Sequence, residues 1–171
     1  MNQDNLTQFV QLFTLADMEA SQHVTERLSL VLRDPAAYQT EYEEELAERG
    51  IETELPAQEL RDVVLIDALL SEELLWEADW KDSVADIAYG INETLTQQSR
   101  AERLDEPAFA KYSLTGPEAL DAIQEALEPL GLAVVLFNLS SDSYPLSVVA
   151  DAQAEEVRRL AQEIGFNLTV Y

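Results

Sequence analysis

Apolar positions in the first half of the chain recur at the spacing of α-helices. Leu6, Phe9 and Phe13 fall on one face of a first helix, and a second stripe runs from Ala20 to Val31. A third helix is predicted over Pro35–Arg49, because proline suits the first turn of a helix. The N-terminal part is therefore predicted to be helical.

The next segment, Leu60–Trp76, is apolar around nearly its whole circumference. A helix of this kind lies in the centre of a core or at a subunit interface, so a homodimer through this segment is one expectation. After a turn at residues 79–82, Ser83 and Asp86 form a capping box, which predicts the start of another amphipathic helix.

The C-terminal part changes to a mixed pattern. A helix with a stripe from Leu120 to Leu130 is followed by β-branched and aromatic runs at Leu132–Leu139 and Leu146–Ala150, then by a helix that ends at Gly165 and a strand over Phe166–Tyr171. The order is α-β-β-α-β. Because a strand, helix, strand crossover leaves its two strands parallel, we expect a small mixed sheet of three strands with helices on one face.

The fold class predicted from these elements is α+β. Residues 1–98 form the helical part and residues 112–171 the small α/β part. The polar segment 99–111, which contains Pro107, is the expected linker within one compact unit.

Composition narrows the class of protein. Hydrophobic residues make up 47% of the chain, which is enough to form a core. The absence of cysteine removes disulfides, thiolate nucleophiles and zinc sites that need sulfur. The longest apolar run, Leu132–Phe137, is too short to cross a bilayer, and the first residues do not resemble a signal peptide, so a cytoplasmic location is expected.

The net charge is the most unusual property of the sequence. Thirty-four acidic residues stand against ten basic ones, giving −24, whereas a small domain typically carries a magnitude of about 2–8. Such a charge repels nucleic acid phosphates and anionic lipids and favours a basic protein partner. The same acidity is also explained by solubility, or by a salty cytoplasm, without any partner.

One set of carboxylates has the spacing of a metal site. Glu44, Glu45 and Glu48 would share one helix face, and Glu59 and Asp62 would share a face of the next helix. This spacing resembles the all-α nucleoside triphosphate pyrophosphohydrolases, and the resemblance implies that these carboxylates bind Mg²⁺ ions that activate water. The connection is shorter than in that family, a glycine and a proline interrupt it, and the C-terminal part has no counterpart there. A solvated acidic helix explains the same residues.

Two tryptophans and a lysine are candidates for an interface or a pocket. Trp76, Trp80 and Lys81 lie close together in the sequence, and tryptophan is enriched at binding hot spots. The alternative interpretation is that both indoles are packed in the core.

The remaining polar candidates have structural explanations. Asp79, Asp82 and Asp86 could be drawn as a metal cluster, but Asp82 and Asp86 lie where negative charge favours a helix N-terminus, which explains them sufficiently. His23 is the only histidine, and no cysteine or serine motif accompanies it, so it is interpreted as structural. No catalytic residue is assigned on this evidence.

Three short motifs carry a resemblance to a known family. They are Asp79-Trp80-Lys81 before a helix, Ser141-Asp142-Ser143-Tyr144-Pro145-Leu146 in the hairpin, and Ile164-Gly165-Phe166 near the end. Together they resemble an uncharacterised bacterial domain family over residues 70–171. The resemblance implies no residue roles, because that family has no established activity.

The sequence therefore favours a non-enzymatic, immunity-like or inhibitory interaction protein without a cofactor. A Mg²⁺-dependent nucleotide hydrolase is the alternative.

Overall fold

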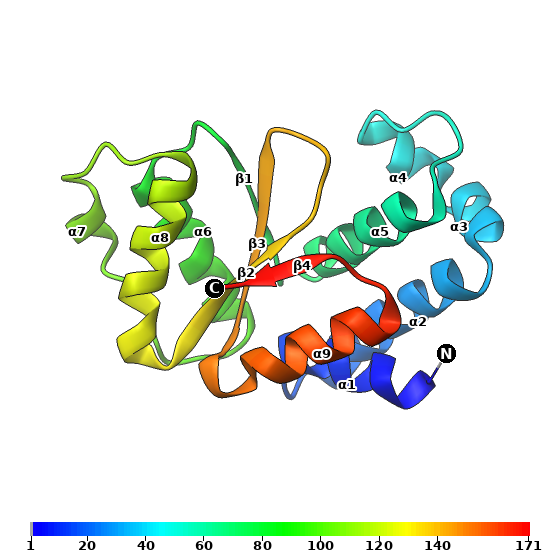
Figure 1. The fold of residues 1–171 in the computed structure, drawn as a ribbon, viewed down its shortest axis with the longest axis horizontal. Coiled ribbons are helices and arrows are strands. Elements are labelled where there is room, and N and C mark those ends of the chain that lie inside the picture. The colour runs from blue at the N-terminus through cyan, green and yellow to red at the C-terminus, as the bar shows by residue number, and fades with distance from the viewer. Residues whose placement is uncertain (1) are drawn as a thin grey trace.

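The structure, a computed structural model, describes residues 2–171. Figure 1 shows its elements in chain order. The helices are α1 Gln3–Thr14, α2 Met18–Arg33, α3 Pro35–Glu41, α4 Glu43–Glu48, α5 Ala57–Ser71, α6 Val84–Gln97, α7 Glu106–Phe109, α8 Gly116–Leu127 and α9 Ala154–Ile164. The strands are β1 Trp76–Asp79, β2 Leu132–Phe137, β3 Ser143–Ala150 and β4 Leu168–Val170.

The α+β class is confirmed, but the sheet is not mixed. Its order is β1-β3-β2-β4, and every neighbouring pair is antiparallel. The crossover through α9 does leave β3 and β4 running in the same direction. However, β2 lies between them, so the predicted parallel pair does not form. The predicted hairpin is confirmed, with Val134 opposite Val148.

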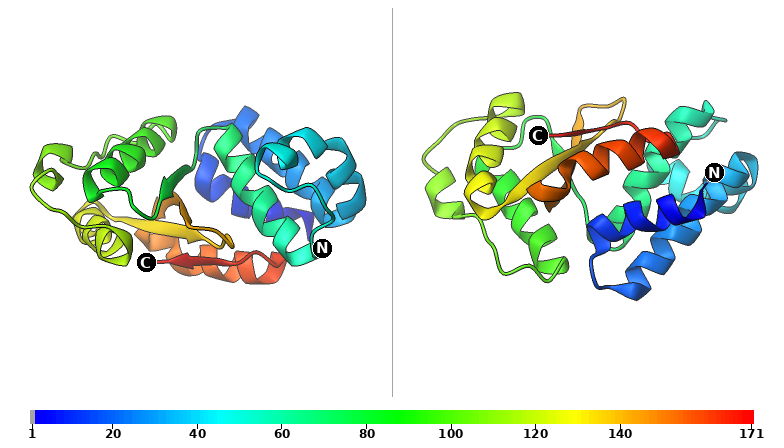
Figure 2. Two further views of the ribbon diagram at one scale, coloured as in Figure 1. Left: turned by 90° about the horizontal axis from the view of Figure 1, so that it is seen from above. Right: turned by 60° about the horizontal axis from the view of Figure 1, so that its bottom comes forward.

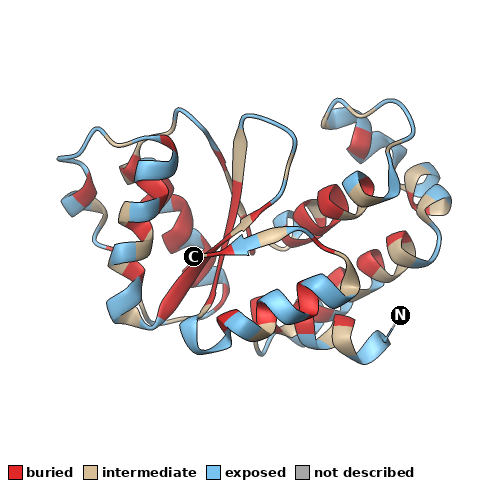
Figure 3. Ribbon diagram, in the orientation of Figure 1, coloured by how far each residue is buried: buried red, intermediate tan, exposed pale blue. Residues whose placement is uncertain are grey.

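Helices cover both faces of the sheet, so the prediction of one covered face was wrong (Figure 1). Leu132 and Val134 of β2 join a core with α6 and α8, whereas Ala133 and Val135 join the core of α1, α2, α5 and α9. Figure 3 shows β2 as almost entirely buried. A strand covered on both faces is apolar at consecutive positions, which is the pattern of Leu132–Phe137.

The larger of the two cores includes the apolar face of α1. The Phe9 ring packs 5.3 Å from Phe13 and 5.4 Å from Phe166, and Phe13 lies 5.7 Å from Phe137 of β2. The first helix is therefore packed against elements from the last part of the chain, as the two views in Figure 2 show.

The central apolar helix is shorter than predicted. It ends at Ser71, and Trp76 begins strand β1 instead. Glu73 has a left-handed φ of 59°, which ends the helix. The apolar pattern of the sequence continues through the buried Leu74 and Leu75, so periodicity alone does not indicate where the helix ends. Other elements of the same chain cover the apolar residues of α5. A homodimer through this helix stays a prediction.

The helix predicted over Pro35–Arg49 is interrupted at Tyr42, which separates α3 from α4. The rings of Tyr38 and Tyr42 stack with centroids 4.4 Å apart, and the Arg27 guanidinium lies 4.5 Å from the Tyr42 ring. Arg27 Nε also donates a 2.8 Å hydrogen bond to the hydroxyl of the fully buried Tyr38. This stack of two tyrosine rings and a guanidinium joins α2 to the interruption between α3 and α4.

The polar segment 99–111 contains α7 and the buried side chains of Leu104 and Phe109. The Asn92 amide of α6 makes two hydrogen bonds with the backbone of Leu104. Gln98, just before the segment, donates from Nε2 to the carbonyl oxygens of Phe13 and Val148. The division into domains 1–98 and 112–171 stays a prediction.

Among residues 2–171, no helix combines the length and the apolar character that spanning a membrane requires.

Gly90 on α6 permits a close approach that a larger residue would block. A Cβ at this position would lie 2.2 Å from Cγ of Trp76. We expect Gly90→Ala to lower the free energy of unfolding by about 1–3 kcal/mol, because overpacking outweighs the gain in helix propensity. Urea denaturation measures this. In a Trp76→Ala background, which removes Cγ and the ring and so the clash, the same substitution should stabilise the protein; destabilisation there would contradict the explanation.

Burial raises the pKa of Tyr38, and the hydrogen bond from Arg27 opposes this only in part. The folded protein therefore holds the phenolic proton more tightly than the unfolded chain, so this stabilising contribution is present below about pH 10 and is lost as pH rises above it. In an ultraviolet titration, Tyr38→Phe should remove the last tyrosinate step. Tyr112→Phe, which removes an exposed phenol, should leave that step intact.

Candidate functional site

Two cavities lie on either side of the β2–β3 loop, residues 138–142. The α5 cavity, of about 370 Å³, lies between this loop, the α4–α5 segment and β1. The α9 cavity, of about 760 Å³, lies between the loop and the α9–β4 segment. Asn138, Leu139 and Ser141 line both. The loop is thus the wall shared by the two hollows, and we treat this region as the candidate functional site.

A partly buried ion cluster lies beside the α5 cavity. Arg49 Nε donates to Oδ1 of Asp67 on α5 at 2.9 Å, and Arg49 Nη1 donates to Oε1 of Glu77 on β1 at 2.8 Å. The three side chains are 18%, 11% and 23% exposed, respectively. Burial alone lowers the pKa of Arg49, but its hydrogen bonds to Glu77 and Asp67 outweigh this effect and raise it. Arg49 therefore stays charged and joins the α4–α5 segment to α5 and β1.

The cluster extends to the loop through two serines. The Ser143 hydroxyl donates to Glu77 Oε1 at 3.0 Å, and the hydroxyls of Ser141 and Ser143 lie 2.8 Å apart. Glu77 accepts from two nitrogens of Arg49, so it is held as an ion-pair partner and not as a free base. These contacts fix the loop and supply no activated nucleophile.

Asp62 forms a second buried anchor. Its carboxylate accepts from the backbone and side-chain nitrogens of Asn167, at 2.9 and 3.1 Å, and from Gln58 Nε2. Gln58 also donates to the carbonyl oxygen of Gly165 at 2.8 Å. Asp62 therefore ties the first turns of α5 to the segment that leads into β4.

The five carboxylates of the hydrolase alternative do not converge. Glu44 and Glu48 are exposed on α4, Glu45 pairs with Arg27, Glu59 is exposed on the first turn of α5, and Asp62 is buried against Asn167. Across residues 2–171, no group of three or more acidic or histidine side chains is placed to hold a metal ion. The short α4 and the segment that separates it from α5 prevent the two predicted faces from lying side by side.

The tryptophan pair is divided between core and surface. Trp76 is half-buried over Gly90 and meets the Tyr89 ring edge-on at 5.6 Å. Trp80 is 46% exposed, and Lys81 Nζ lies 5.1 Å from its ring. None of the three predicted interface residues lines either cavity. Their role as an interface stays a prediction.

The other polar candidates make local contacts. Ser83 and Asp86 form the predicted capping box, and the Asp79 carboxylate accepts from the backbone nitrogen of Lys81 at 2.8 Å. His23 Nδ1 lies 2.9 Å from Glu72 Oε1, away from the cavities, with its side chain 54% exposed.

Sequence reasoning missed the ion cluster of Arg49, Asp67 and Glu77. A signal was present: Asp62 and Asp67 are carboxylates within a helix predicted to be buried, and a buried carboxylate needs a partner. Arg49 is the single base among the carboxylates of residues 41–54.

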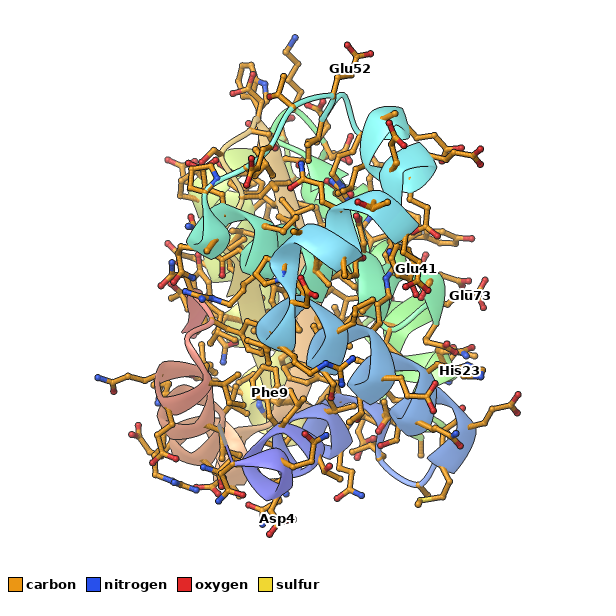
Figure 4. All side chains as sticks on the ribbon, turned by 90° about the vertical axis from the view of Figure 1, so that its right-hand side faces the viewer. Asp4, Phe9, His23, Glu41, Glu52 and Glu73 are labelled. Atoms are coloured by element: carbon orange, nitrogen blue, oxygen red, sulfur yellow. The ribbon has the colours of Figure 1, made fainter. Side chains whose placement is uncertain are left out.

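Acidic residues greatly outnumber basic residues in the part of the chain that forms most of the α5 cavity. Residues 1–80 contain nineteen acidic residues and four arginines. We name seven exposed carboxylates of α3, α4, the α4–α5 segment and the start of α5 the acidic lobe: Glu41, Glu43, Glu44, Glu48, Glu52, Glu54 and Glu59. Figure 4 looks onto this side of the molecule and shows Glu52 projecting outward at its upper edge. Of the four arginines, Arg27 pairs with Glu45, and Arg49 belongs to the ion cluster.

Fold and site together define an α+β domain in which two cavities share one hairpin loop as a wall. The chain matches the family described as Domain of unknown function (DUF6630) over residues 5–171, and it belongs to that family. The expected resemblance to a domain of unknown function is confirmed, and the match also includes the N-terminal helices. No curated protein and no solved structure gives a significant match.

The ion cluster should contribute strongly to stability. Arg49→Met leaves Asp67 and Glu77 partly buried without their cation, so we expect a loss of about 3–5 kcal/mol in the free energy of unfolding. Urea denaturation measures it. Arg159→Met, which breaks exposed pairs with Glu156 and Glu163 on α9, should have a much smaller effect.

The loss in Arg49→Met should depend on pH. Burial raises the pKa of Asp67, and removal of Arg49 removes the main opposing effect. A carboxyl with a raised pKa in the folded state favours folding at pH values below its unfolded pKa, and this contribution disappears as pH rises through the folded pKa. The deficit relative to the unsubstituted protein should therefore be smallest near pH 4 and grow toward pH 7. A pH-independent deficit would contradict the assignment.

Proposed function

We propose that this protein is a non-enzymatic interaction domain whose acidic lobe binds a basic protein partner, in the manner of an immunity or inhibitory protein. The observation that carries the proposal is the gathering of seven exposed, unpaired carboxylates within residues 41–59, in contrast to the acidic surface of α9. On α9, Glu155, Glu156 and Glu163 are each paired with a neighbouring arginine. Among the described residues, none of the seven carboxylates of the acidic lobe makes an ion pair.

Unpaired charges of one sign on one surface create a field that extends into solvent. Such a field accelerates the approach of an oppositely charged protein and orients it before contact. Solubility alone requires no such concentration, because charges distributed over the whole surface serve it equally well. The concentration of carboxylates on the lobe therefore favours a partner.

The hydrolase alternative has less support. It needs several carboxylates gathered around a common point, and Glu44, Glu48 and Glu59 are exposed and separate from the buried Asp62. Carboxylates that are dispersed over the surface do not bring a bound Mg²⁺ ion, a nucleotide and the attacking water to one point.

Charge reversal on α4 tests the proposal. Immobilised protein is used to capture partners from extract of the source cells at increasing salt. The triple variant Glu43→Lys, Glu44→Lys, Glu48→Lys should lose capture by about tenfold or more, and capture by the unsubstituted protein should fall steeply with salt.

The matched control makes the same change of charge on α8, where Glu118, Asp121 and Glu125 are exposed on the opposite side of the sheet. Reversal there should leave most capture intact. Equal losses in both variants, capture that does not respond to salt, or no capture would each refute the proposal. Circular dichroism confirms that both variants are folded.

A further inference from the structure

The α5 cavity combines apolar walls with a carboxylate rim. Ile51, Leu55, Val63 and Leu139 provide the apolar surface, and Glu59, Asp62 and Glu77 provide the carboxylates. Its volume of about 370 Å³ lies at the lower end of the range for ligand sites. A ligand with an apolar stem and a polar end suits such a lining.

The charge of the cavity selects the sign of that polar end. Arg49 is the one cation in the lining, and Asp67 and Glu77 together exceed its charge. The Asp62 carboxylate accepts hydrogen bonds from Gln58 and Asn167, which are neutral donors, so its negative charge is not cancelled there. The nearby Arg61 guanidinium is directed to Gln58 and Gly165 and does not line this cavity. The net charge at the rim is therefore negative.

Glu59 is the carboxylate available to a ligand. It is exposed on the first turn of α5, lines the cavity, and makes no side-chain hydrogen bond or ion pair within the described part of the chain. The carboxylates are distributed around the rim and do not form a metal-binding group in residues 2–171. An organic cation fits this distribution better than a metal ion. Carboxylates on several sides of the rim can attract its charged end, and its apolar stem can occupy the apolar part of the cavity.

We infer that the α5 cavity receives an arginine or lysine side chain of the basic partner, with the aliphatic stem against Leu55, Val63 and Leu139 and the cationic end at Glu59. This inference rests on the proposed function and gives the partner an anchor residue. Long cationic side chains bury their stems along apolar surface while the charge remains near water, and arginine is enriched at hot spots. Glu59 of the acidic lobe lines the cavity, and Glu52 and Glu54 lie on the same α4–α5 segment as the lining residues Ile51 and Leu55, so the charge of the lobe would direct a basic surface toward the cavity.

The test uses blocked amino acids as probes on the full-length protein. N-acetyl-arginine amide, N-acetyl-lysine amide and the neutral N-acetyl-norleucine amide are titrated separately at low salt while backbone amide shifts are recorded by NMR. The two cationic probes should shift the amides of Leu55, Glu59, Leu139 and Ser140. Norleucine amide should bind more weakly.

Glu59→Gln should weaken binding of the arginine probe about fivefold, which corresponds to about 1 kcal/mol. Glu54→Gln removes an equally exposed carboxylate of the acidic lobe that does not line this cavity, and should leave the affinity unchanged. Equal effects of the two substitutions, or shifts spread over α8, would overturn the inference. So would norleucine binding as tightly as arginine.

Other occupants give different results. Tighter binding of spermidine than of the arginine probe would assign the cavity to a small polyamine, and concentration-dependent shifts of the same amides without a probe would assign it to a second copy of the chain. Either result overturns the inference.

The test also separates this inference from the proposed function. Salt-sensitive capture of a partner without any binding of the arginine probe would refute the cavity assignment alone. Binding of the probe at the cavity without capture of any partner would refute the proposed function alone.

Discussion

The structure depends on the burial of one hairpin, β2 and β3, on both of its faces. Val134 and Val135 are neighbours in the sequence, yet they belong to two different cores. Each helix layer therefore needs the hairpin to complete its apolar surface, and the hairpin needs both layers to exclude water. The loop that joins β2 to β3 is mostly exposed, and the two cavities share it as a wall.

Two groups of carboxylates around the candidate site differ in their surroundings. Asp62, Asp67 and Glu77 are partly or fully buried, and each has partners that connect separate elements. The carboxylates of the acidic lobe are exposed and unpaired in the described structure. The first group organises the site, and the second gives its surroundings their charge. A net charge of −24 is therefore compatible with a well-packed interior, because few of the charges enter it.

Much of the fold could be predicted from periodicity, and the failures have physical causes. The capping box at Ser83 and the β2–β3 hairpin were predicted because their signals are local. Strand β1 was missed because Leu74 and Leu75 continue the apolar pattern of α5 beyond the helix end. The second covered face of the sheet and the Arg49 cluster depend on contacts between residues far apart in the sequence. No local pattern records which carboxylate will meet which arginine, and the site was therefore not predicted as a unit.

The contact of Phe9 with Phe166 has a consequence for biosynthesis. Phe9 of α1 is translated long before Phe166, the ring against which it packs. Until then, the apolar side of α1 has no complete docking surface. The larger core therefore becomes complete only after the region around Phe166 has been synthesised, and a chain that stops before this region exposes an aromatic surface to the cell's quality-control machinery.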